Sequence, residues 1–116
     1  MRFHSDLLRP ARVALVSCVK TKRAAASPAG ELYTSSLFVG MRSFAQRNAD
    51  TWYILSAKYG LLHPDQVVDP YEMTLNTMKK PDRLAWAEQV QQKLLATLPA
   101  AAEVMFLAGE RYREVL

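Results

Sequence analysis

The stretch TWYILSAKYGLLHPDQVVDPY, residues 51–71, begins with an apolar run and ends in a polar segment with two X-Pro pairs. Its first part, 51–57, is rich in aromatic and β-branched residues, which predicts a strand buried on both faces. From 58 to 78 neither a helical nor a strand period is present, so we expect a long ordered loop with at most one short turn of helix. Loops of that length inside compact domains are usually functional.

Two further strands are predicted on either side of this stretch. The segments RVALVSC, 12–18, and EVMFLAG, 103–109, are short, apolar and β-branched. Because apolar residues occupy both alternations of such segments, they are typical of strands in a parallel sheet covered by helices.

Helices are predicted between these strands. The first begins near Thr34, where Thr34, Ser35 or Ser36 can cap it, and ends at 48–50. The second begins with Pro81 in its first turn and ends before Pro99. The third begins in ERYREVL, 110–116. The predicted core-facing stripes are Tyr33, Leu37, Met41, Phe44 and Ala45 in the first helix, and Leu84, Ala87, Val90, Leu94, Leu95 and Leu98 in the second.

The order of these elements predicts an α/β fold, a three-layer domain with a mostly parallel sheet flanked by helices. With 116 residues, we expect a tail at 1–11 and a single domain at 12–116. The sequence stops in or just after the third predicted helix, where a further strand is expected to close the sheet. Three interpretations stay open: an exposed edge, an edge covered by a partner, or a domain that lacks its C-terminal strand.

Composition narrows the class of protein. No stretch has the roughly 18 apolar residues of a membrane span, and the first residues do not form a signal peptide. The single cysteine, Cys18, cannot form an internal disulfide, so a cytoplasmic location is expected.

The net charge is +4. The basic clusters are either the footprint of a nucleic acid or a solvated surface with a basic bias, and they comprise Lys20, Lys22 and Arg23, then Lys79, Lys80 and Arg83, then Arg111 and Arg113.

Polar or small residues follow all three predicted strands. In open parallel sheets, ligands bind in the crevice beyond the carboxyl ends of the strands, and these residues are expected to meet there. The first strand ends in Ser17 and Cys18 with Lys22 nearby, the second in Ser56 followed by Lys58 and Gly60, and the third in Gly109 and Glu110.

Each candidate has a structural and a functional interpretation. Lys58 is either a solvated lysine or a point charge that holds a phosphate or carboxylate. Cys18 is either a small core residue or a nucleophile activated by a nearby lysine. Gly109 and Glu110 either form a tight turn or let a phosphate approach a helix N-terminus. Tyr71 either packs in the loop or stacks on a base.

Several site types have no support in the sequence. No Cys/His pair has the spacing of metal ligands, and neither a dinucleotide-binding nor a P-loop motif is present, so no metal or cofactor is predicted. If the chain is an enzyme, the catalytic candidates are Cys18, Lys22, Lys58 and Glu110.

Three blocks resemble a known family. VALVSCVKTKRAAASPAGELYTSSLF, WYILSAKYGLLHPDQVVDPYEMTL and VMFLAGERYREVL are similar to a bacterial domain of unknown function grouped with YaaA-like proteins. That resemblance implies DNA binding and a link to the oxidative-stress response. More distantly, Cys18, Lys22, Tyr33 and Ser36 are similar to a signature in a domain of archaeosine synthase, which modifies a deazaguanine base in transfer RNA. Val39 stands where that signature has a histidine.

These observations support three functional hypotheses. The first is a nucleic-acid-associated domain that binds DNA, RNA or a nucleotide-like small molecule at the strand ends, with Lys22 and Lys58 on phosphate and Tyr33 or Tyr71 near the base. The second is an enzyme that modifies a base or nucleotide. The third is a small interaction subunit whose sheet edge is completed by a partner or by a homo-oligomer.

Overall fold

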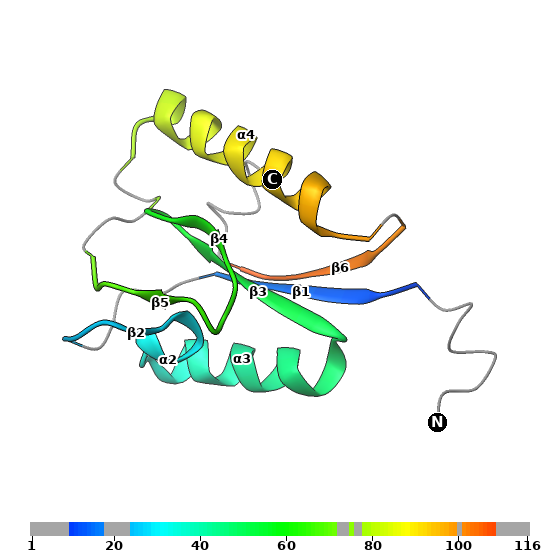
Figure 1. Ribbon diagram of the computed structural model, residues 1–116. Coiled ribbons are helices and arrows are strands. Elements are labelled where there is room, and N and C mark those ends of the chain that lie inside the picture. Colours follow the sequence, from blue (N-terminus) through cyan, green and yellow to red (C-terminus); the bar gives the residue numbers. More distant parts are fainter. Residues whose placement is uncertain (1–9, 18–23, 72–74, 76–77, 100, 109–116) are drawn as a thin grey trace.

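A four-stranded sheet forms the centre of the molecule (Figure 1). The computed structural model describes residues 10–17, 24–71, 75, 78–99 and 101–108. The strands lie in the order β4 (Gly60–Leu62), β3 (Thr51–Ser56), β1 (Arg12–Ser17) and β6 (Glu103–Leu107). β3 and β6 both pair with β1 in parallel, and β4 pairs with β3 in antiparallel orientation. The predicted mostly parallel sheet is therefore confirmed.

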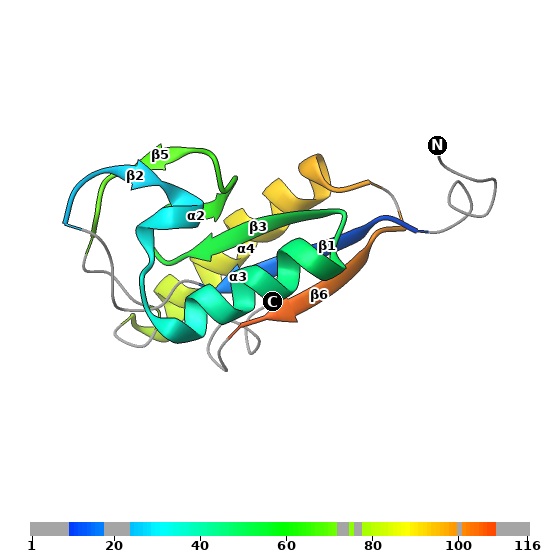
Figure 2. The same ribbon diagram turned by 90° about the horizontal axis from the view of Figure 1, so that it is seen from below.

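Helices cover both faces of this sheet. α3 (Ser36–Asn48) lies on one face and α4 (Lys80–Thr97) on the other, as Figure 1 shows. A small lobe lies on the α3 face beside β3 (Figure 2). It contains α2 (Ala29–Leu32) and a two-stranded antiparallel sheet of β2 (Ser27–Pro28) and β5 (Val67–Val68). The three-layer α/β arrangement is thus confirmed.

The alternation of side chains along β1 divides the core between the two faces. Ala14 and Val16 pack on the α3 side, and Val13 and Leu15 pack on the α4 side. All four are fully buried. A helix covers each face of the sheet, so side chains on both faces of β1 are buried. This double burial is the reason why both alternations of the strand are apolar.

The first predicted helix exists, but its buried face differs from the predicted stripe. Ser35 is the N-cap, and its hydroxyl accepts a hydrogen bond from the Phe38 amide at 3.2 Å. Phe38 and Ala45 are fully buried, whereas Leu37 and Phe44 are 64% and 43% exposed. The predicted stripe was wrong at these positions because apolar residues at helical spacing occur on two adjacent faces of α3, and only one of them meets the sheet.

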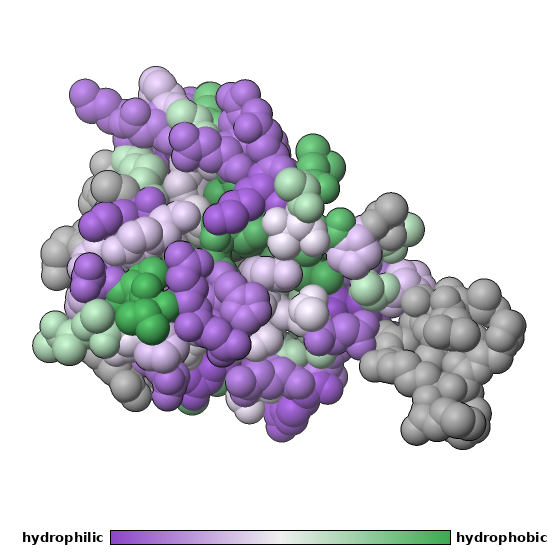
Figure 3. All heavy atoms as spheres, viewed as in Figure 1, coloured by the Kyte–Doolittle hydropathy of each residue, from purple (hydrophilic) through white to green (hydrophobic). Residues whose placement is uncertain are grey.

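The second helix shows a similar shift. α4 has Pro81 in its first turn, as expected, but Leu84 and Leu95 are exposed. Trp86, which the predicted stripe omits, is buried beside Ala87. Hydrophobic atoms are visible at the C-terminal end of α4 in Figure 3, where Leu95 is 85% exposed.

The predicted long loop after β3 was wrong. The chain turns back at once after Ser56 and forms β4, so that Ser56 pairs with Gly60. Gly60 has φ +75°, a left-handed conformation that glycine adopts without steric cost and that such a tight turn requires. β5 follows and pairs with β2. Strands of two and three residues are too short to show a period, which explains why the sequence pattern did not reveal them.

β6 is an edge strand in the described part of the sheet. Val104 and Phe106 are about two-fifths exposed. The third predicted helix lies outside the described residues. In the portion of the chain that the structure describes, no helix has both the length and the apolar character needed to cross a membrane.

Candidate functional site

The carboxyl ends of three strands lie along one edge of the sheet, because β1, β3 and β6 are parallel. After β1 the chain passes through α3 to β3 on one side, and later through α4 to β6 on the other side. The strand order therefore reverses between β1 and β6, and ligands of open α/β sheets bind beside such a switch point.

The predicted site residues at this edge divide into two groups. Cys18, Lys22, Gly109 and Glu110 lie outside the described residues. Those that the structure places at or near the edge are Ser17, Tyr33, Ser36, Ser56, Lys58, Gly60 and Tyr71.

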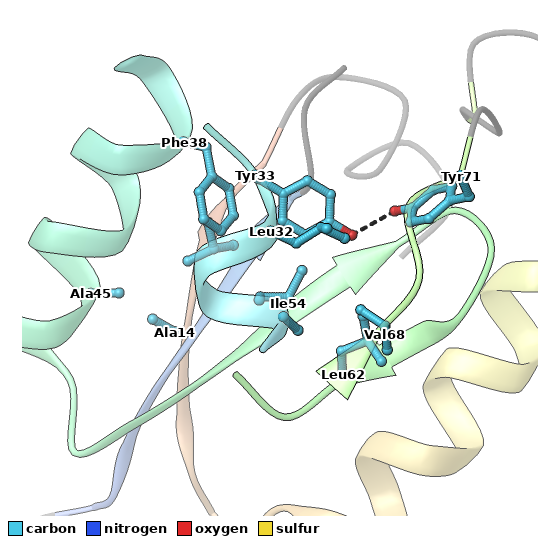
Figure 4. Close-up of a cluster of buried hydrophobic side chains, with 11 residues drawn as sticks. Ala14, Leu32, Tyr33, Phe38, Ala45, Ile54, Leu62, Val68 and Tyr71 are labelled. Carbon is cyan, nitrogen blue, oxygen red and sulfur yellow. Dashed lines mark hydrogen bonds between the residues drawn. The ribbon is translucent and has the colours of Figure 1, made fainter. Parts of the chain in front are cut away.

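Three buried hydroxyl groups meet at the carboxyl end of β3. The Tyr33 and Tyr71 hydroxyl oxygens are 2.6 Å apart, and they point toward each other in Figure 4. The Ser56 hydroxyl donates a hydrogen bond to the Tyr71 hydroxyl at 2.7 Å. We call Tyr33, Ser56 and Tyr71 the hydroxyl cluster. Each is at most 7% exposed, so the cluster satisfies polar groups inside the core.

Ser56 also fixes two other segments. Its hydroxyl oxygen accepts a hydrogen bond from the Tyr59 amide at 3.1 Å, which closes the turn between β3 and β4. Its carbonyl oxygen accepts a hydrogen bond from Trp86 Nε1 at 2.8 Å. One residue at the end of β3 therefore holds the turn, the Tyr71 segment and α4 in fixed positions.

Lys58 is exposed at the tip of this turn. Its ammonium nitrogen lies 5.3 Å from the centroid of the Tyr59 ring. The Tyr59 ring is half-buried, contacts Tyr71 edge-on at 5.4 Å, and its hydroxyl donates to the Asp69 carbonyl oxygen at 3.2 Å. A mobile cation next to a fixed aromatic ring can contact an anion and a flat apolar group together.

The amino end of α4 adds basic residues near this edge. Because Trp86 contacts Ser56, the first turns of α4 lie close to the end of β3. Lys79 and Lys80 are exposed there, whereas Arg83 donates to the Met78 carbonyl oxygen at 2.6 Å. Cations at a helix N-terminus oppose the helix dipole. Helix stability thus gives no reason for these two lysines.

The other predicted residues have simpler environments. Ser17 is buried at the end of β1, and Gly60 pairs with Ser56. Ser36 is exposed in the first turn of α3 and has no described bond to the hydroxyl cluster. Sequence reasoning missed Tyr59 and Trp86. A tryptophan directly before Ala87 of the predicted stripe is the signal that points to Trp86.

The arrangement supports binding more directly than chemistry. The cluster hydroxyls are buried and bonded to one another, and among the described residues no nucleophile lies beside a general base. In those same ranges, no group of three His, Cys, Asp or Glu side chains could hold a metal ion. Lys58, Lys79 and Lys80 are exposed cations near this edge, where Asp69 and Asp82 are exposed as well.

Comparison with known proteins places the chain in a family. Residues 13–116 match a family of unknown function (DUF6884). The chain belongs to this family. A DUF6884 assignment does not by itself give an activity.

A curated relative supports the assignment. The uncharacterised protein YfjM of Bacillus subtilis (strain 168) is 30% identical over 112 residues, which cover 90% of this chain and 74% of YfjM. No solved structure matches the chain. The function of this DUF6884 chain therefore has to be argued from the geometry of its carboxyl edge.

Proposed function

We propose that the chain binds a phosphate-bearing nucleotide or a segment of nucleic acid at the carboxyl edge of the sheet, where Lys58 contacts a phosphate. The observation that carries this proposal is the position of Lys58. Its ammonium is exposed on a turn that Ser56 fixes, at the edge where the parallel strands end. A compact point charge on a rigid turn is suited to a phosphate oxygen.

Two further features support the choice of an anion. Lys79 and Lys80 lie near the same edge and oppose the dipole of their own helix. The whole chain carries a net charge of +4. Both features raise the local concentration of a polyanion. The resemblance to YaaA-like proteins, which implies DNA binding, agrees with this direction.

The structure changes which aromatic ring we expect near a base. Tyr33 and Tyr71, the rings expected from the sequence, are buried and use their hydroxyls within the cluster. Tyr59 is half-buried and lies beside Lys58. We therefore assign base stacking to Tyr59; a ring that stacks on a base contributes roughly 1–3 kcal/mol.

The test is a titration of fluorescently labelled single-stranded DNA, duplex DNA and RNA at several salt concentrations. We expect binding at low salt that weakens as salt rises. Lys58→Ala should weaken binding to all sequences alike and reduce the slope of log K against log salt by about 0.7 to 0.9. Tyr59→Leu should weaken single-strand binding more than duplex binding.

Arg47→Ala is the matched control. Arg47 is exposed in the last turn of α3, which leads into the amino end of β3 and thus lies away from the carboxyl edge. The Arg47→Ala substitution removes one positive charge, as Lys58→Ala does, but at the other end of the sheet. An equal loss in Arg47→Ala and Lys58→Ala, or no binding at low salt, overturns the proposal.

A second candidate is an enzyme that modifies a base or nucleotide. It is favoured by Tyr33, which falls in the segment similar to the archaeosine synthase signature and whose hydroxyl is held at 2.6 Å from Tyr71. In this function Cys18 and Lys22 would act on the base, and the buried Tyr33 would support the site without contacting the ligand. Mass spectrometry of nucleosides from transfer RNA incubated with the chain tests it. A mass change that Cys18→Ser abolishes supports an enzyme, and unchanged nucleosides leave binding as the function.

A further inference from the structure

A second surface lies away from the carboxyl edge, beside the amino-terminal half of β3. It is a groove of about 580 Å³ between α2, α3 and the turn at His63–Asp65. Its floor includes Thr51, Trp52 and Tyr53. The proposed nucleotide site does not use any of these residues.

The groove follows a part of β3 that has no neighbouring strand on one side. β4 pairs only with Ile54, Leu55 and Ser56, and the ladder ends before His63, whose ring contacts the Tyr53 ring edge-on at 6.0 Å. In the described part of the chain, no strand lies beside 51–53 on the side opposite β1. Such an edge is a template for an added strand.

The charges around the groove are mainly acidic. Glu31, Asp50 and Asp65 line it and are exposed; the Asp50 carboxylate also accepts a hydrogen bond from the Arg12 amide at 2.8 Å, and the Asp65 carboxylate lies 3.8 Å from His63 Nδ1. Arg42 also lines it and keeps its positive charge, with its guanidinium donating to the Gly30 carbonyl oxygen at 2.7 Å, so three carboxylates face one arginine. His63 Nδ1 accepts a hydrogen bond from the Asp65 amide at 3.1 Å. An acidic groove on a chain of net positive charge selects a cationic partner and disfavours nucleic acid.

The groove walls are rigid because their backbones are tied together. The Gly30 amide donates to the Pro64 carbonyl oxygen, and the Ala29 amide donates to the Gln66 carbonyl oxygen, both at 2.7 Å. A Cβ on Gly30 would lie 3.2 Å from Pro64 Cβ and 3.3 Å from the Trp52 ring, so the backbone of α2 packs closely against both groups. A preformed groove requires little ordering when a peptide enters it.

We infer that this groove binds an extended basic peptide, which pairs with the free edge of β3 at 51–53 and places lysine or arginine side chains against Glu31, Asp50 and Asp65. The backbone supplies strand pairing, and the carboxylates select the charge. The aromatic rings of Trp52 and Tyr53 offer apolar surface to the stems of long basic side chains.

The probe is a fluorescein-labelled (Lys-Val)₄ peptide, compared with (Glu-Val)₄ and with a (Lys-Val)₄ peptide whose alternate backbone nitrogens are methylated. Fluorescence anisotropy at low salt should show binding of the basic peptide alone. Methylation removes the backbone donors but keeps the charge, and we expect it to abolish binding. Equal binding of the methylated peptide overturns strand pairing, and binding of the acidic peptide overturns charge selection.

Variants locate the site. Glu31→Gln and Asp65→Asn should each weaken binding roughly threefold, since both carboxylates are exposed. Glu88→Gln, an exposed position on α4, is the control and should have no effect. In NMR spectra, amide shifts on peptide addition should centre on 51–53. Shifts centred elsewhere, or equal losses in all three variants, overturn the inference.

Discussion

The carbonyl oxygen of Ser56 accepts a hydrogen bond from Trp86 Nε1 at 2.8 Å, which attaches α4 to the end of β3 across 30 residues of sequence. The hydroxyl of Ser56 donates to Tyr71 and accepts from Tyr59. The turn that carries Lys58 therefore depends on contacts made by distant segments.

Tyr71→Phe should destabilise the fold by roughly 1–3 kcal/mol. The change removes the hydroxyl that joins Ser56 to Tyr33 and leaves buried polar atoms with fewer partners. Urea denaturation measures the free energy of unfolding. Tyr59→Phe is the control, because its hydroxyl bonds to Asp69 at an exposed position and should contribute less. Equal effects in the two variants would show that the buried cluster adds no stability.

Trp86→Phe should cost roughly 2–4 kcal/mol, because it removes the donor to the Ser56 carbonyl and leaves a cavity beneath α4. Trp52→Phe is the matched change. Trp52 is half-buried, and its indole nitrogen has no hydrogen bond among the described residues, so the loss should be smaller. Thermal unfolding of both proteins provides the comparison, and a larger loss at Trp52 contradicts the prediction.

Gly60→Ala and Gly40→Ala should change the free energy of unfolding in opposite directions. At Gly60, φ is +75°, so an alanine is strained by about 1–2 kcal/mol even though its Cβ meets only Val90 at 3.6 Å. At Gly40, in α3, nothing lies within 4 Å of an added Cβ, and the change should stabilise by roughly 0.5–1 kcal/mol. Chemical denaturation of each variant distinguishes the signs. Destabilisation at both sites is inconsistent with this account.

Phe38→Ala and Phe44→Ala test which face of α3 is buried. Phe38 is fully buried, and its truncation should cost about 3–5 kcal/mol. Phe44 is 43% exposed, and the same truncation should cost about 1 kcal/mol. The losses of stability in the two variants, measured from unfolding midpoints, show which face of α3 is buried. A larger loss at Phe44 would restore the stripe predicted from the sequence.

The sequence predicts those elements whose signal is local. β1, β3 and β6 are apolar runs, and Ser35 is a capping residue at a helix start, so each was found. β4 was missed because it has three residues, and its identity as a strand depends on pairing with β3. Whether so short a segment forms a strand depends on the strand it pairs with, which lies elsewhere in the sequence.

In the candidate site, too, the sequence predicts the local features but not the contacts between distant residues. The sequence places Ser56 and Lys58 at a strand end, and the parallel sheet gives the edge on which they lie. The contacts of Tyr33 with Tyr71 and of Ser56 with Trp86 join residues 38 and 30 positions apart. Periodicity cannot identify such pairs. They bury Tyr33 and Tyr71 and leave Tyr59 partly exposed, which is why Tyr59 is proposed as the ring near a ligand.

The turn closed by Ser56 has a consequence for the thermodynamics of binding. The hydrogen bond from the Tyr59 amide to the Ser56 hydroxyl already holds the backbone around Lys58. A phosphate that binds there as proposed would therefore not have to order a loop. The main conformational cost is the loss of rotamers in one lysine side chain, up to about 2 kcal/mol. Weakening the turn, for example through Ser56→Ala, should therefore lower the affinity for the proposed anion through entropy, although Ser56 is fully buried and is not expected to contact it.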